Sequence, residues 1–245
     1  MSPQHINTST AATLALTLAL TLALAPAGTA RAQEGSSTDS GTNPCGAIRV
    51  SGQYGPFDYR KDTDKLPVVI SHHFTPQVEM LIRGQEGRIG ADIDYTLRAI
   101  PNHPRALLAM MNLGEKEKTL QPVGANYSVE CYFERAIRFQ PDDQVVRMVY
   151  VTYLMKQTRL KEARTQLAAV EELAGDNPLT YYNLGLLYFD LKDYDKSLTY
   201  AHKAREMGVM QPGLKDKLSQ VGRWVEPAAA TASAPAPDAK PASAP

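Results

Sequence analysis

Large apolar residues in the C-terminal half of the chain recur three and four residues apart, and small residues follow them. In one stretch the large residues are Tyr181, Leu184 and Tyr188, and the small ones are Gly185, Ser197 and Ala204. Spacings of three and four residues place side chains on one face of a helix. Small residues further along let a second helix approach the first closely. The pattern therefore predicts a pair of packed helices over residues 178–211.

The same pattern recurs one repeat length earlier in the chain, and part of it recurs once more before that. The earlier positions are Tyr150, Leu154, Ala163 and Leu167, and before them Phe133, Ala136 and Pro141. The first unit aligns only with an insertion of about eight residues around 121–128, after an opening helix at 104–118. Repetition at a fixed period predicts similar units stacked on one another. We assign the units to residues 102–141, 144–177 and 178–211.

These units resemble the tetratricopeptide repeat, a helix–turn–helix whose period is about 34 residues. The segment from Cys131 to Pro141 resembles that family's closing segment, in which an Ala on the second helix precedes a Pro by five residues. Val151 and Ala201 depart from the family's pattern, which has a small residue and an aromatic residue at these positions. The resemblance implies an all-α fold, a short α-solenoid of about three helical hairpins that binds other proteins and catalyses no reaction.

A further helix is expected after the last unit. Leu214, Leu218, Val221 and Trp224 recur at helical spacing, which predicts a helix within residues 212–225. Repeat arrays require such a helix to cover the exposed end of the stack. We therefore interpret Trp224 as a residue that packs on the last hairpin.

Residues 44–101 do not follow the repeat, and we expect an irregular segment with short helices. Thr75 is placed as the N-cap of one helix and Pro76 as its first residue. Residues 95–102 indicate a lone second helix that ends at Pro101. Four short stretches of this segment, residues 43–46, 55–60, 73–79 and 91–98, resemble sequences of an uncharacterised group of exported tetratricopeptide proteins of Gram-negative bacteria.

Residues 1–32 are interpreted as an export signal. The apolar run Leu14–Ala25 is followed by small residues at Ala30 and Ala32, which predicts cleavage near Ala32–Gln33. An uncleaved membrane anchor is the alternative, but the run has about twelve apolar residues and a bilayer requires about twenty. We therefore expect a soluble protein in the periplasm or outside the cell, with no stable membrane insertion.

Composition indicates the state of the two segments that flank the foldable region, and it gives the net charge. Residues 33–43 are polar and small, and residues 226–245 are mostly Ala, Pro and Ser, so both are expected to be disordered. Removal of the signal takes Arg31 from 26 basic and 26 acidic side chains, which leaves a net charge of −1. This charge excludes a strongly basic nucleic-acid footprint.

The chain has two cysteines, Cys45 and Cys131. An exported protein meets an oxidising compartment, which favours a disulfide between them over two unpaired thiols. Such a bond would hold the irregular N-terminal segment on the helical array.

Several polar residues are candidates for a catalytic or metal-binding role. His72 and His73 are adjacent and have no other ligand at a suitable spacing, so a surface or turn pair is favoured over a metal site. His103 is interpreted as a turn residue, and Asp92 and Asp94 as acids that complement the dipole at a helix start. No phosphate loop or hydrolase motif is present, and we predict no catalytic, cofactor or metal site.

The resemblance places a binding groove on the first helix of each hairpin. The inward positions it implies are Ala106, Met110 and Leu113, then Met148, Thr152, Met155 and Lys156, then Tyr182, Leu186, Phe189 and Asp190. From these we assign partner binding to Met110, Met148, Thr152, Met155, Tyr182, Leu186 and Phe189. Apolar side chains at Ala106, Met110 and Leu179 argue against the family's charged carboxylate clamp. The groove is therefore predicted to hold either an apolar segment of a protein partner or the protein's own N-terminal segment.

Three functions are consistent with these patterns. The first is an exported scaffold that binds a protein or peptide in the cell envelope. The second is an enzyme or metal-binding protein that uses the His72–His103 region. The third is a structural subunit tethered to the envelope.

Overall fold

All secondary structure in the described part of the chain is helical. The computed structural model describes residues 43–85 and 87–227, and within them there are helices and turns but no strand. The predicted signal, nearly all of the predicted linker and all but two residues of the predicted tail lie outside these residues. All the described residues belong to one unit.

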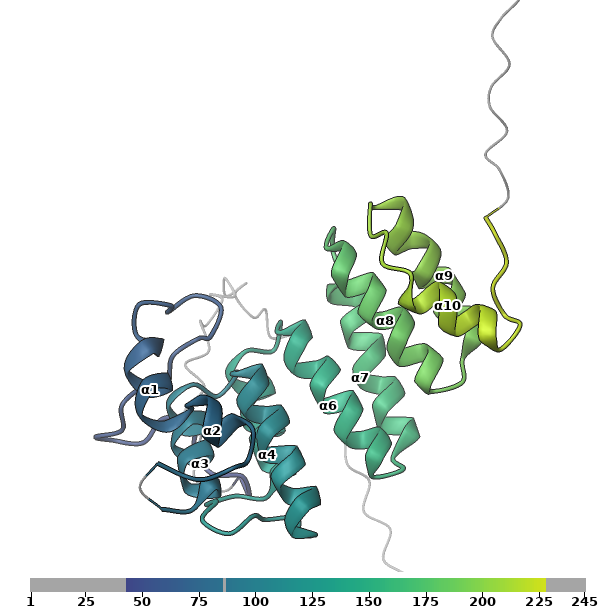
Figure 1. Cartoon of the computed structure of the whole chain (residues 1–245). Helices are drawn as coiled ribbons and strands as arrows, with labels where there is room; N and C mark the ends of the chain where they lie inside the picture. The colour runs from purple at the N-terminus through teal and green to yellow at the C-terminus, as the bar shows by residue number, and fades with distance from the viewer. Residues whose placement is uncertain (1–42, 86, 228–245) are drawn as a thin grey trace, which may run out of the picture. The chain divides into compact units, whose positions relative to one another are not determined.

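Three helical hairpins occupy the region in which the repeats were predicted (Figure 1). The first pairs α4 (Pro104–Glu117) with α5 (Val129–Phe139). The second pairs α6 (Gln144–Lys156) with α7 (Leu160–Leu173), and the third pairs α8 (Pro178–Asp190) with α9 (Tyr194–Glu206). Successive first helices pack on one another, α4 on α6 and α6 on α8. The predicted fold class, an all-α solenoid-like array, is confirmed.

The first helix of each hairpin begins at a capping side chain. His103, Asp143 and Asn177 each accept a hydrogen bond from a backbone N–H in the first turn, at 3.0–3.1 Å. The separation of Asp143 from Asn177 matches the period of the repeat, whereas His103 and Asp143 lie further apart in the chain. The difference lies in the turns, since residues 118–128 join α4 to α5 while three residues join the helices of the later hairpins. The predicted insertion is therefore present.

Small residues bring the helices of the last hairpin together, as the sequence pattern predicts. Ser197 is buried on α9, and its Oγ donates to the carbonyl oxygen of Gly185 on α8 at 2.8 Å. A Cβ at Gly185 would lie 3.3 Å from the Ser197 carbonyl oxygen and would clash with Leu214. The large residues of the pattern, among them Leu154 and Leu167, are fully buried between the helices.

The last helix, α10 (Gly213–Gln220), covers the end of the third hairpin but is shorter than predicted. Leu214 and Leu218 are buried against Ala201, whereas Val221 follows the helix and is exposed. Trp224 lies beyond the helix and meets the His202 ring edge-on, with ring centroids 4.9 Å apart. Trp224 therefore packs on the last hairpin as expected, although from a loop and not from a helix.

The N-terminal segment contains more helix than predicted. Its helices are α1 (Leu66–His73), α2 (Pro76–Glu79) and α3 (Ile89–Ala99). Helix α2 begins at Pro76 as expected, and α3 covers most of the predicted lone helix, but α1 was not predicted. Helix α3 packs on α1, α2 and α4, so it continues the array toward the N-terminus.

The predicted disulfide joins the first described residues to the first hairpin. Cys45 and Cys131 are bonded, with an S–S distance of 2.07 Å and Cα atoms 5.0 Å apart. Next to the bond, the buried Arg135 donates from Nη1 to the carbonyl oxygens of Cys45 and Ala47, at 2.9 and 2.7 Å. Residues 45–47 therefore lie along α5, the second helix of its hairpin.

Candidate binding surface

The first helices of the three hairpins carry equivalent positions that we call the inner face. We define it from the capping residues, which fix the equivalent positions on each helix. The inner face consists of Arg105, Leu108, Asn112 and Glu115 on α4, Val145, Met148, Thr152 and Met155 on α6, and Leu179, Tyr182, Asn183, Leu186 and Phe189 on α8. Apart from Asn183, which follows Tyr182 directly, these positions recur three and four residues apart, as a helix face requires.

The positions predicted for the first unit were wrong. Met110 has no exposed surface, and Ala106 and Leu113 are 0% and 1% exposed. All three lie in the central core. The extra residues after α4 obscured the alignment of this unit, so the predicted register was displaced from the true one. The inner stripe of α4 contains Leu108, which is 41% exposed, and Asn112.

The positions predicted for the second unit do lie on the inner face. Thr152 and Met155 are half-buried on α6. Met148 lies on the same stripe but is only 8% exposed, so little of its side chain is accessible to a partner.

In the third unit the predicted residues also contact the capping helix. Tyr182, Leu186 and Phe189 are half-buried and pack against the cluster of Ala201, Leu214 and Leu218. The cap therefore covers part of the α8 stripe. Leu179, at the start of α8, is 52% exposed and remains accessible.

Both apolar side chains and ion pairs are exposed on the inner face. Near the beginnings of the helices, Leu108, Val145 and Leu179 are 41%, 48% and 52% exposed. Near their ends, Lys156 on α6 pairs with Glu115 on α4, with Nζ and Oε1 2.8 Å apart. At the start of α4, Arg105 pairs with Glu79 of α2, so the exposed apolar side chains lie between ion pairs.

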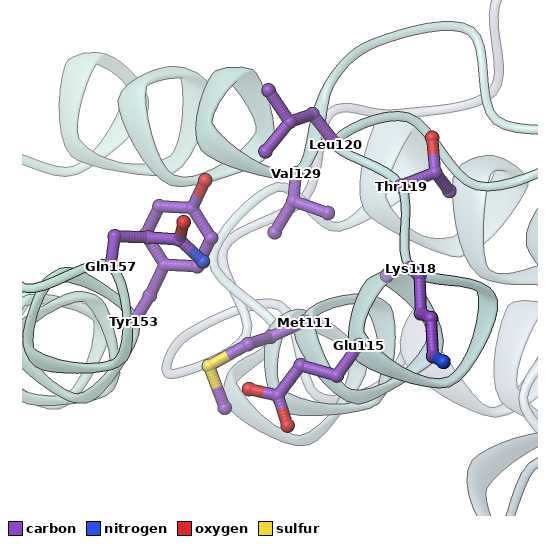
Figure 2. A pocket seen from close by; sticks show the side chains of 9 residues that line it. Met111, Glu115, Lys118, Thr119, Leu120, Val129, Tyr153 and Gln157 are labelled. Carbon is purple, nitrogen blue, oxygen red and sulfur yellow. The ribbon is translucent and has the colours of Figure 1, made fainter.

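A pocket lies where α4 and α6 end, beneath the loop that follows α4 (Figure 2). Its volume is about 230 Å³. Figure 2 shows Met111 and Glu115 from α4 and Tyr153 and Gln157 from α6 and its C-terminus around the opening, with Leu120 of the loop opposite. This volume is below the range of roughly 300–1,000 Å³ for small-molecule sites. The pocket therefore suits one side chain of a bound peptide better than a separate ligand.

The loop over this pocket is the inserted segment of the first hairpin. A Cβ at Gly114 would lie 3.0 Å from the Thr119 carbonyl oxygen and 3.0 Å from Val129 Cγ2. Glycine therefore lets the loop and α5 approach α4 closely. This pocket was not predicted from the sequence, although the predicted insertion indicated that the first hairpin has extra structure at this position.

The histidines of the alternative site do not come together. His72 is exposed on α1, and His103 is buried as the N-cap of α4. His73 lies 3.2 Å from Asp92, Nδ1 to Oδ1, and stacks on Tyr95 with ring centroids 3.9 Å apart. His72 therefore lies on the surface at the end of α1, one of the two predicted alternatives for the pair. His103 closes a turn, as predicted, because its N–H donates to the Ile100 carbonyl oxygen at 3.1 Å, and it also caps α4.

The two acids of α3 have different surroundings. Asp92 is in the first turn, as predicted, but Asp94 lies beyond it. The Asp94 carboxylate accepts hydrogen bonds from the Tyr132 hydroxyl, from Asn126 and from Arg98. Its main role is therefore to join α3 to the first hairpin, a role that the dipole interpretation missed.

Metal-ligating groups gather at one place in the described residues. Cys45, Cys131 and Glu134 lie close together there, but both sulfur atoms are in the disulfide and offer no thiolate.

Among the described helices, none is long and apolar enough to cross a membrane. Comparison of the chain with protein-family models, curated proteins and solved structures finds no match.

Proposed function

We propose that the chain is an exported scaffold of the tetratricopeptide type that binds an extended, apolar segment of another protein on its inner face. The observation that supports this most directly is the exposure of Leu108, Val145 and Leu179 on three successive first helices. Apolar side chains exposed together on one face indicate an interaction surface. The disulfide is consistent with an oxidising compartment.

An extended segment fits better than a helix because of the polar groups beside these apolar residues. Asn112 and Asn183 are exposed, and among the described residues neither side chain has a hydrogen-bond partner. Each amide can donate and accept. An extended peptide has main-chain groups that need such partners, whereas a helix satisfies its own.

Substitutions at exposed positions test the proposal without disturbing the core. Peptides are selected from a displayed random library with the purified, oxidised protein, and their affinities are measured by fluorescence anisotropy. The double variant Val145→Asp/Leu179→Asp should weaken selected peptides at least tenfold, about 1.4 kcal/mol, because it buries carboxylates in the interface.

Leu160→Asp provides the matched control. Leu160 is 49% exposed on α7, a second helix, so it resembles Leu179 in exposure but lies off the inner face. Its affinity should stay within about twofold of the parent. Failure to select any peptide, or equal weakening by the control, would contradict the proposal. Circular dichroism confirms that each variant remains folded.

A further inference from the structure

Two hollows adjoin at the stacked pair His73 and Tyr95, away from the inner face. One has a volume of about 280 Å³, and its other lining residues are Tyr54, Val68, Val69 and His72. The second has a volume of about 340 Å³ and is lined mainly by polar and charged residues. The combined volume of the two hollows is within the range of roughly 300–1,000 Å³ typical of small-molecule sites.

The first hollow is lined by valine and aromatic side chains, with His72 and His73 beside them. Val68 and Tyr54 are 48% and 46% exposed, and Val69 is buried beneath them. Residues of this kind accommodate an aromatic ring or a branched aliphatic group. The exposure of Val68 and Tyr54 leaves this surface accessible from solvent.

The second hollow has unused hydrogen-bond donors but few unused acceptors. Its two carboxylates, Asp92 and Asp94, are 7% and 2% exposed and already accept hydrogen bonds. Arg98 uses its Nε on Asp94, which leaves its terminal nitrogens for another group. Arg88 also lines this hollow, and no described residue forms a hydrogen bond or ion pair with its side chain.

The position of Arg88 adds to this excess of donors. It is the N-cap residue of α3, a helix of 11 residues, and its side chain forms no capping hydrogen bond. The acid of this first turn, Asp92, is nearly buried and already hydrogen-bonded to Gln85 N–H, so it leaves the Arg88 guanidinium without a partner among the described residues. A ligand that accepts hydrogen bonds and carries negative charge matches this chemistry.

We propose that this cleft binds a small amphipathic anion. An aromatic or branched apolar group would lie against Val68 and Tyr54, and a carboxylate would face Arg88 and Arg98. His73 and Tyr95 lie between the two parts and position them. The proposal is independent of the inner face, since no residue is shared by the two sites.

The test is calorimetric titration of the intact protein with three probes that share a phenylpropyl skeleton. These are 3-phenylpropanoate, its primary amide and 3-phenylpropylamine. The carboxylate should bind with a dissociation constant below about 1 mM, and the amide and the amine at least tenfold more weakly. Equal binding of the three probes, or no binding of the carboxylate at about 10 mM, overturns the proposal.

Two variants separate the two halves of the cleft. Arg88→Gln removes the cation without breaking a described side-chain contact, and Val68→Asp places a negative charge at an exposed apolar position. Each should weaken the carboxylate at least tenfold. Lys161→Gln, an exposed cation on α7, is the matched control and should leave the affinity unchanged. If Arg88→Gln binds as tightly as the parent, the assignment of the anion site is wrong.

Discussion

At the scale of single residues, His103 combines a capping hydrogen bond with almost complete burial. Its Nδ1 accepts a hydrogen bond from the Ala106 backbone N–H at 3.1 Å, which requires an unprotonated Nδ1. The ring lies against Tyr59 and Phe74, with centroids 4.5 and 4.9 Å away. Burial lowers the pKa of His103 to about 4, because a charged ring would lose its hydration there.

This burial predicts a loss of stability in mild acid. The unfolded chain binds a proton at His103 near pH 6.5, whereas the folded protein binds it only near pH 4. The free energy of unfolding should therefore fall as pH decreases through this window, by about 3 kcal/mol in total. Urea denaturation at a series of pH values measures the effect.

The variant His103→Asn isolates the titration. Asparagine keeps a capping acceptor but does not titrate, so this component of the pH dependence should disappear.

Asp58 contributes to the pH dependence of stability at lower pH. Burial opposes ionisation of Asp58, but hydrogen bonds from Arg60 and Asn102 outweigh it and lower its pKa, so its stabilising effect is lost only below about pH 4. If the free energy of unfolding of His103→Asn decreases between pH 6.5 and 4 as steeply as that of the parent, titration of His103 does not account for the effect.

At the scale of elements, the capping helix α10 closes an apolar surface that α8 and α9 leave open. Leu214 and Leu218 are 1% and 0% exposed and meet Ala201, with Tyr182 and Phe189 at the edge of the contact. Helix α10 has only eight residues, too few for stability in isolation. Its structure therefore depends on these apolar contacts.

Leu214→Ala should consequently destabilise the protein by about 2–5 kcal/mol, the usual cost of a cavity in a packed core. Amide hydrogen exchange should increase first in α10, because this short helix is held by its packing on α8 and α9, in which Leu214 takes part. Val221→Ala is the control. Val221 lies beyond the helix and is 43% exposed, so its effect should remain within about 0.5 kcal/mol. Equal protection of α10 in the Leu214 variant and the parent would argue against its role as a cap.

At the scale of the whole described molecule, residues near the start are tied to the hairpins by covalent and polar contacts. The disulfide spans 86 residues. A buried cluster adds to it, in which Asn102 donates to Asp58 at 2.8 Å and to Asp143 at 2.9 Å. Asp143 also caps α6, so one cluster connects the N-terminal segment, the first hairpin and the second.

Removal of the disulfide should lower stability without removing the helices. In the chain-entropy treatment, a loop of this length stabilises the protein by up to about 4–5 kcal/mol. The double variant Cys45→Ser/Cys131→Ser should lose up to that amount in chemical denaturation, while its helical circular dichroism at 25 °C stays near that of the parent. Reductant should destabilise the parent and leave the variant unchanged. If reductant affects the two proteins equally, the disulfide does not account for the loss.

The features that depend on the local periodicity of the chain were predictable from the sequence. The spacing of Tyr181, Leu184 and Tyr188 specifies a helix because residues three and four apart share a face. The constant period between units specifies repeated hairpins, and residues such as Leu214 and Leu218 indicate a cap. The pairing of Cys45 with Cys131 followed from the expected compartment and from the presence of only two cysteines.

Tertiary structure decided which face of each helix is accessible and which polar groups meet. Leu108 and Met110 lie on the same helix and are both apolar, yet one is exposed and the other is fully buried. Their spacing does not distinguish them, because burial depends on neighbours distant in the chain. The same reason explains the contact of His73 with Asp92, the network around Asp94 and the pocket beneath the inserted loop. The sequence by itself determined stacked helical hairpins, and packing between distant segments determined where a partner or a ligand can bind.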